Sequence, residues 1–177
     1  MERYTFLIKA PHGYNVEKIS EKVREFVKNN FGNEVKVEVY RCIGLTVDIV
    51  ILYKNGIVLI RRKNYPYKNY WAIPGGFVEY GEKVEEAAIR EAKEETGLDV
   101  KLVGLIGVYS DPNRDPRGHT VTTAFLALGN GELKGGDDAK EARVFGVNEI
   151  EALPLAFDHG KILADAIQKA RELKLVR

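Results

Sequence analysis

Glutamates are crowded into the segment from Gly76 to Leu98, and their spacing suits metal chemistry. The content of Ala, Glu and Lys, the absence of proline and the closing Gly97 predict a helix over residues 83–96. At about 100° per residue, Glu91 and Glu95 fall on the same face as the apolar residues of this helix. Two carboxylates therefore lie on the side of the helix that should be buried.

Burying these two carboxylates unpaired would cost several kcal/mol, and like charges one helical turn apart repel each other. We therefore expect a cation to be bound between them. Carboxylate oxygens favour Mg2+, for which Mn2+ can substitute, and the segment has no His or Cys that would favour zinc. Glu94 borders the same face and offers further oxygen ligands. The alternative is a surface helix with a solvated charge run, which is how we interpret Glu85 and Glu86.

The segment resembles the Nudix box, in which Gly, five residues, Glu and seven residues are followed by Arg-Glu, an aliphatic residue, any residue, Glu-Glu, any residue, Gly and an aliphatic residue. Members of this family hydrolyse a nucleoside diphosphate linked to another moiety, and their box folds as loop, helix and loop. Ala92 and Leu98 occupy the two aliphatic positions. The specified positions of the box are all matched, by Gly76, Glu82, Arg90, Glu91, Glu94, Glu95 and Gly97.

The resemblance implies a role for each of these residues. Glu91 and Glu95 become the principal metal ligands, Glu94 a further ligand at the catalytic centre, and the backbone at Gly76 lies against the metal. The other box residues are expected to be structural: Arg90 and Glu82 orient the glutamates by ion pairing, and Gly97 ends the helix in a left-handed conformation.

A general base that reaches the attacking water is expected outside the box, because relatives recruit it from different loops. The segment GGDDAKEARVF supplies the candidates, with Glu141 first and Asp138 second. The alternative is that these acids are solvated loop residues.

Substrate choice must also come from outside the box. The run from Ser110 to Phe125 resembles the loop and strand that follow the box in ADP-ribose pyrophosphatases, and Pro112 lies close to the position of their characteristic proline. Arg114 and Arg117 in this run could donate forked hydrogen bonds to phosphates. The alternative is that they pair with the aspartates of the same loop.

Before the box, cations alternate with aromatic residues in RRKNYPYKNYWAIPGG. We expect Arg62 to contact a phosphate, as its place in the family's pattern implies. Tyr70 is among the aromatic residues on which an adenine could stack, although most of them are expected to pack.

The elements that must position these residues alternate along the chain. The resemblance implies an α/β fold, a Nudix α/β/α sandwich around a mixed β-sheet. The sequence agrees with this fold, because it contains several strand-like runs and a helical pattern near the C-terminus. Asp158 could cap that C-terminal helix. A hairpin signal lies at Lys54-Asn55-Gly56. The predicted strands are Leu45–Tyr53, Ile57–Arg62, Val100–Tyr109, Thr120–Leu128 and Ala142–Val147.

Residues 1–42 lie outside the resemblance, and residues 43–177 form the predicted Nudix domain. Alternating apolar residues flank a helical pattern that Asn15 could cap, so we expect a small N-terminal β-α-β extension. About 40 residues bury too little surface to stand alone, so the extension should pack on the Nudix domain or mediate a homodimer.

Composition excludes several partner classes. The chain has 177 residues, 45% hydrophobic and 30% charged, enough for one sizeable core. A formal net charge of +1 gives no sign of a nucleic-acid or acidic-membrane partner. The single cysteine and the lack of a signal-like or membrane-spanning apolar run lead us to expect a cytoplasmic protein.

These observations lead to one main hypothesis and two alternatives. The main one is a Mg2+-dependent hydrolase that cleaves ADP-ribose, or a related ADP-sugar, to AMP and a sugar phosphate. The first alternative is a Nudix hydrolase for nucleoside triphosphates or dinucleoside polyphosphates. The second is a Nudix-fold sensor that binds ADP-ribose without cleaving it.

Overall fold

The computed structural model describes residues 16–32, 43–135 and 139–176, and internal contacts divide the chain into two units, Met1–Cys42 and Ile43–Arg177. In the first unit, α1 spans Val16–Phe31 and confirms the expected helix there. The strands expected on either side of it, and its proposed cap Asn15, lie outside the described residues.

The second unit is built on a mixed β-sheet, in which the described residues contribute seven strands. The path of paired strands is β3-β2-β1-β6-β5, while β4 pairs with β1 and β7 with β2. β1 and β6 run parallel, and the other pairs are antiparallel. The strands are β1 (Gly44–Tyr53), β2 (Gly56–Arg62), β3 (Trp71–Ala72), β4 (Gly75–Phe77), β5 (Asp99–Tyr109), β6 (Thr120–Asn130) and β7 (Ala139–Phe145).

Five of these strands agree with the runs expected from the sequence to within a few residues at each end. β1 and β2 form the predicted hairpin, in which Tyr53 pairs with Gly56. Lys54 and Asn55 turn the chain with positive φ angles of 45° and 64°. β3 and β4 escaped prediction because two or three residues are too short to show a periodic pattern.

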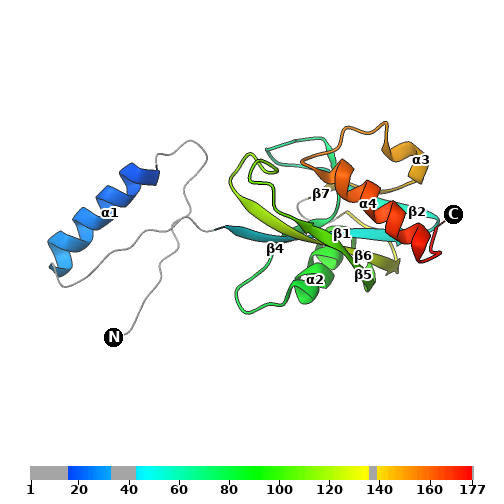
Figure 1. The fold of residues 1–177 in the computed structure, drawn as a ribbon, viewed down its shortest axis with the longest axis horizontal. Coiled ribbons are helices and arrows are strands. Elements are labelled where there is room, and N and C mark those ends of the chain that lie inside the picture. Colours follow the sequence, from blue (N-terminus) through cyan, green and yellow to red (C-terminus); the bar gives the residue numbers. More distant parts are fainter. Residues whose placement is uncertain (1–15, 33–42, 136–138, 177) are drawn as a thin grey trace. The chain divides into compact units, whose positions relative to one another are not determined.

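A helix covers each face of the sheet, α2 (Val84–Thr96) on one and α4 (His159–Glu172) on the other, while the short α3 (Val147–Ile150) precedes α4 (Figure 1). Side chains alternate along β1 between the two cores: Val47 and Ile49 pack toward α2, whereas Val50 and Leu52 pack in the α4 core. The structure therefore confirms the α/β/α sandwich. Among the described residues, no helix combines the length and apolar character that crossing a bilayer requires.

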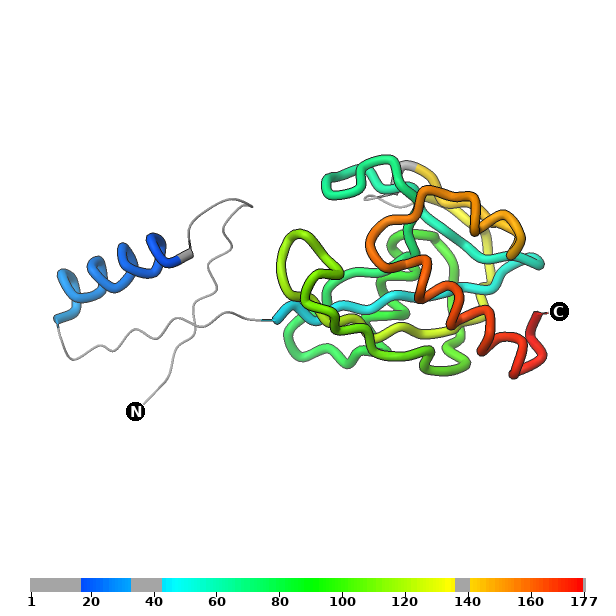
Figure 2. Tube along the Cα trace, turned by 45° about the horizontal axis from the view of Figure 1, so that its top comes forward, coloured from blue at the N-terminus to red at the C-terminus, as the bar shows by residue number. Residues whose placement is uncertain are grey.

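Three connections reach the same end of the sheet (Figures 1 and 2). They are residues 63–70 between β2 and β3, residues 78–83 before α2, and residues 110–119 between β5 and β6. The residues expected to bind substrate and the loop that precedes the box helix therefore lie at one end of the domain.

Candidate active site

Helix α2 is fixed at both ends by interactions local to the box. At its start, the Glu86 carboxylate accepts a hydrogen bond of 3.1 Å from the backbone N–H of Lys83. At its end, Gly97 adopts the predicted left-handed conformation with φ 71°, and its N–H donates to the Lys93 carbonyl at 2.9 Å. Leu98 is then fully buried. These anchors set the rotation of the helix and thus the direction of its glutamates.

Glu91 and Glu95 both face the short strand β4. The Glu95 carboxylate accepts a hydrogen bond of 2.8 Å from the backbone N–H of Gly75. The Glu91 carboxylate packs so closely on Gly76 that any side chain at position 76 would collide with it. Two carboxylates of α2 thus lie against the glycine backbone of β4, and a side chain at position 76 would require Glu91 to move.

Arg90 connects the acidic residues of the box. Its guanidinium donates to both carboxylate oxygens of Glu82 at 2.9 Å each, in a forked arrangement. It also donates to Glu91 at 2.7 Å, to the exposed Glu94 at 3.2 Å and to the Phe77 carbonyl at 3.1 Å. Arg90 is therefore ion-paired with Glu82, Glu91 and Glu94, and the orienting role that the resemblance implies for Arg90 and Glu82 stays a prediction.

The two carboxylates bonded to Arg90 differ in their electrostatics. Hydrogen bonds from Arg90 and from the Glu79 backbone lower the pKa of Glu82 to about 2. Burial raises the pKa of Glu91, although Arg90 opposes this shift. The Glu91 side chain is only 14% exposed, so its anion is poorly solvated and favours a further cation nearby.

These residues fit a divalent metal ion by their chemistry. Carboxylate and backbone oxygens are the donors that Mg2+ and Mn2+ take, and Glu91 is a buried carboxylate whose charge is costly without a cation. Among the described residues, however, no group of three or more acidic, His or Cys side chains is gathered closely enough to hold a metal ion. Arg90 supplies the positive charge next to Glu91 in this arrangement.

Arg62 and Arg117 come from different connections and meet on one aromatic ring. Their guanidinium carbons lie 4.8 Å and 5.5 Å from the ring centroid of Phe157. Arg62 donates to the Pro66 carbonyl at 2.9 Å, and Arg117 forms a forked pair with Asp115. Two cations of the expected substrate site thus contact the same aromatic ring.

Arg114 lies in a different environment from Arg117. Its side chain is 5% exposed and donates to Asp158 at 2.9 Å and 2.7 Å, to Asp48 at 3.4 Å and to Thr120 at 3.3 Å. The aspartates of its own loop, which were the alternative to a phosphate contact, therefore accept no hydrogen bond from its side chain, which donates to acids of β1 and of the start of α4 and to Thr120 of β6. Asp158 occupies the N-cap position of α4 but makes no side-chain cap bond, because its carboxylate pairs with Arg114.

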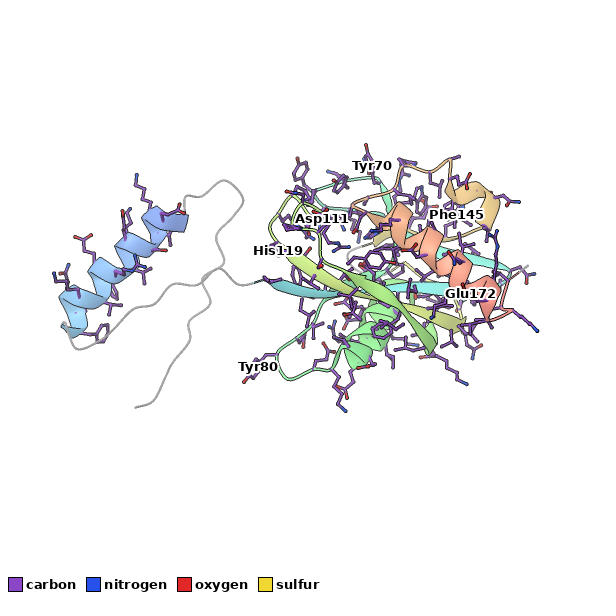
Figure 3. All side chains as sticks on the ribbon, viewed as in Figure 1. Tyr70, Tyr80, Asp111, His119, Phe145 and Glu172 are labelled. Carbon is purple, nitrogen blue, oxygen red and sulfur yellow. The ribbon has the colours of Figure 1, made fainter. Side chains whose placement is uncertain are left out.

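The remaining predicted site residues are more exposed. Tyr70 is 42% exposed on the β2–β3 connection and makes an edge-to-face contact with Tyr67 at 5.7 Å (Figure 3). Glu141 lies on β7 opposite Arg61 and approaches its guanidinium to 4.0 Å. Asp138 lies outside the described residues.

Three residues that the sequence did not single out also lie in this region. Asp48 and His159 are buried next to the residues that lead into the box. The ring of Phe157 lies against the guanidinium groups of Arg62 and Arg117. Asp48 left a signal, because it interrupts the otherwise apolar run Leu45–Tyr53. No periodic pattern marks Phe157 or His159, which precede and begin α4.

Comparison with known proteins agrees with this architecture. A family model described as the NUDIX domain matches residues 43–166. An ADP-ribose pyrophosphatase of Methanocaldococcus jannaschii is 54% identical over 131 residues, 73% of this chain and 76% of that protein. The ADPR responsive transcriptional repressor NtrR of Acinetobacter baylyi is 34% identical over 133 residues, 71% of this chain and 53% of the repressor.

A solved structure shows the same similarity. The crystal structure of a MutT/nudix family protein from Enterococcus faecalis has a TM-score of 0.69 and 30% identity, covering 90% of this chain and 75% of that one. The box geometry, the sandwich fold and these matches agree with one another. The chain therefore belongs to the Nudix family and is a Nudix pyrophosphatase.

Proposed function

We propose that this Nudix pyrophosphatase hydrolyses ADP-ribose, or a closely related ADP-sugar, to AMP and a sugar phosphate in the presence of Mg2+. The observation that carries the proposal is the pairing of the Glu91 and Glu95 carboxylates with the glycine backbone of β4, in an intact box. The archaeal relative that is named an ADP-ribose pyrophosphatase supports the substrate.

Glu91, Glu95 and the more exposed Glu94 would hold the divalent ion, with the backbone at Gly76 beside it. Bound there, the ion supplies charge neutralisation for the diphosphate and a nucleophilic water at neutral pH. Arg90 opposes the rise in the Glu91 pKa that burial causes, since its guanidinium donates to that carboxylate at 2.7 Å.

The chain's cations and aromatic residues supply the contacts to substrate. Arg62 and Arg117, stacked on Phe157, bind the phosphate oxygens of the diphosphate, and Tyr70 offers an exposed ring to the adenine. Glu141 is the first candidate for the general base, and it would have to leave its 4.0 Å pairing with Arg61 to reach the water. Asp138 remains the second candidate.

A coupled assay tests the proposal. Purified protein is incubated with ADP-ribose and Mg2+, and a phosphatase then releases inorganic phosphate from AMP and the sugar phosphate but not from the intact diphosphate. We expect Mg2+-dependent phosphate release that EDTA abolishes. Initial rates with ADP-mannose, a diadenosine polyphosphate and deoxynucleoside triphosphates rank the alternatives when the nucleotide products are separated by chromatography, since the phosphatase would itself attack triphosphates. A higher kcat/KM for a triphosphate would favour the first alternative.

A second candidate function rests on a different observation. The Acinetobacter baylyi relative is described as an ADPR responsive repressor, so a chain of this fold can respond to ADP-ribose in another way. Calorimetric titration separates the two cases. Tight binding of ADP-ribose in Mg2+ with no AMP formed over hours would favour the sensor.

Assembly and location complete the proposal. We expect a homodimer, because the first unit, Met1–Cys42, is too small to bury much surface by itself. We also expect the protein to be cytoplasmic. Light scattering of the purified chain, compared with a chain that begins at Ile43, checks the assembly. A monomer in both cases would contradict it.

A further inference from the structure

The 73–76 segment, Ile73-Pro74-Gly75-Gly76, is held from both faces of the sheet. From the α2 side, the Glu95 carboxylate binds the N–H of Gly75 at 2.8 Å. From the α4 side, Nδ1 of His159 accepts a hydrogen bond of 2.9 Å from the N–H of Ile73. Pro74 between them has no N–H, so these two bonds are the anchors of the amides on either side of it.

The imidazole of His159 accepts a backbone N–H for which the neighbouring strand-like segment has no free carbonyl. Trp71 pairs with Leu155 in a parallel bridge, in which the Trp71 N–H donates to Pro154 and the Ala156 N–H donates to Trp71, both at 2.9 Å. The next acceptor in such a ladder is the Ala156 carbonyl, but this carbonyl accepts the N–H of His159 at 3.2 Å as α4 begins. The N–H of Ile73 is therefore left for a side-chain acceptor.

The two partners of His159 lie at different nitrogens of its ring. Because Nδ1 accepts from Ile73, the proton of the neutral ring is on Nε2, which lies 3.5 Å from Oδ1 of Asp48. The same Oδ1 lies 3.0 Å from the point where a Cβ on Gly75 would be. Asp48 thus touches both the imidazole and the 73–76 segment, and both residues are buried, at 7% and 4% exposure.

We propose that His159, whose Nδ1 accepts the Ile73 N–H and whose Nε2 faces Asp48, is a positioning residue of the metal site that holds the 73–76 segment in register with Glu95. The inference rests on the proposed function, because Glu95 is a metal ligand there. A backbone that slips by a fraction of an ångström at Ile73 moves Gly75 away from the Glu95 carboxylate, which frees that carboxylate to rotate. Partners that orient a ligand in this way typically contribute about 10- to 100-fold to metal affinity or activity.

The test compares His159→Phe, His159→Asn and His159→Gln in the full chain. Phenylalanine keeps the ring and removes the acceptor. Asparagine places an oxygen near the position of Nδ1, whereas glutamine places its terminal group near Nε2. Mn2+ binding without substrate is measured by electron paramagnetic resonance, kcat and KM are measured with ADP-ribose, and the amide resonances of Ile73 and Gly75 are followed by NMR.

We expect His159→Phe to bind Mn2+ about tenfold more weakly and to lower kcat by about 10- to 100-fold, with KM little changed. The amides of Ile73 and Gly75 should both shift. His159→Asn should recover most of the Mn2+ affinity, and His159→Gln should recover less. Equal Mn2+ affinity in folded His159→Phe and wild type would overturn the inference, and if His159→Phe does not fold, equal affinity of the Asn and Gln variants would overturn it.

Tyr109→Phe is the matched control for a purely structural role. Tyr109 is buried, and its hydroxyl donates to Asp165 of α4 at 2.7 Å, so its loss affects the same helix without touching the 73–76 segment. We expect lower stability with unchanged Mn2+ affinity. Wild-type protein that binds Mn2+ but does not hydrolyse ADP-ribose would contradict the proposed function alone. The Mn2+ and NMR comparisons would then still decide the role of His159.

Discussion

The Glu91 carboxylate occupies the space that a side chain on Gly76 would need. Arg90 donates to an oxygen of the same carboxylate at 2.7 Å. Glu91 thus contacts both a guanidinium and a glycine backbone, and its position depends on both. Substitutions can therefore separate the groups that do chemistry from those that hold them in place.

The box glutamates should differ sharply in their effect on turnover. Replacing Glu95 by Gln removes a negative charge from the metal site, and we expect kcat to fall by about 100-fold or more, which corresponds to about 2.7 kcal/mol of transition-state stabilisation. Glu91→Gln should behave similarly. The measurement is steady-state hydrolysis of ADP-ribose at saturating Mg2+.

Glu86→Gln is the matched control for these two variants. Glu86 lies on the same helix, is exposed, and uses its side chain only to accept from the Lys83 N–H, which a glutamine can also do. Its kcat should stay near that of the wild type. Equal losses from Glu86→Gln and Glu95→Gln would contradict the assignment of the metal-facing side of α2.

The two neighbouring glycines should fail in different ways when changed to alanine. At Gly76 the new methyl group meets only the end of the Glu91 side chain, which can move, so the fold should survive while Mn2+ affinity and kcat are lost. At Gly75 it meets the carbonyl oxygen of Val47 in the adjacent strand, so the protein should lose stability.

Thermal unfolding and Mn2+ titration distinguish these outcomes. Gly160→Ala provides the control, because a methyl group there meets only Leu155 at an ordinary contact distance of 3.7 Å inside a helix. We expect its unfolding temperature and Mn2+ affinity to stay at or above those of the wild type. An active Gly76→Ala enzyme would show that Glu91 does not need its present position.

Arg114 and Arg117 should have separate roles despite lying in one loop. Arg114→Ala leaves Asp48 and Asp158 without their buried cation, and we expect a loss of about 3 kcal/mol or more in the free energy of unfolding. Arg117 is 41% exposed, but its partner Asp115 is only 4% exposed, so Arg117→Ala should cost some stability, less than Arg114→Ala, while raising KM for ADP-ribose by about tenfold, equivalent to about 1.4 kcal/mol.

Urea unfolding and steady-state kinetics measure the two effects. Arg114→Lys is a useful intermediate, since a lysine keeps the charge but cannot reproduce the fork to Asp158. It should recover only part of the stability. A large rise in KM for Arg114→Lys without any loss of stability would instead indicate that Arg114 binds substrate.

The elements of this fold were predictable where a pattern repeats locally. The helix over residues 83–96 and its left-handed end at Gly97 follow from composition and spacing, because intrahelical contacts join residues three or four apart. The contacts of Arg114 could not be predicted in this way. Its partners lie on β1 and at the start of α4, which are remote from it in sequence. Asp158 stands at the N-cap position of α4, but its carboxylate pairs with Arg114 and does not cap the helix.

The same reason explains why His159 escaped notice. Its role depends on Ile73, which is remote in sequence, and on a strand ladder that stops where α4 begins. A single histidine at the start of a helix carries no periodic signal. Only the accounting of backbone N–H groups in the folded chain shows that its side chain is needed.

Stability should fall in mild acid because of His159. Burial lowers its pKa below the ordinary value of 6.5, an effect opposed by Asp48 and Asp158 and assisted by Arg114 and Arg62. The neutral ring is therefore favoured in the folded state, and the unfolded chain binds the proton more readily. The stability that the neutral ring contributes is complete above pH 6.5, and it is lost as the pH falls below 6.5 toward the folded-state pKa.

Urea unfolding of wild type and His159→Asn at a series of pH values from 7.5 down to 5, the range in which an ordinary histidine titrates, measures this contribution. The free energy of unfolding of the wild type should fall more steeply than that of His159→Asn, which cannot be protonated, and the two curves should converge as the pH decreases. Carboxylates remote from residue 159 contribute equally to both proteins, so the difference reports the imidazole together with its coupling to Asp48 and Asp158. Parallel curves would mean that His159 takes up its proton as easily in the folded chain as in the unfolded one, contrary to its burial.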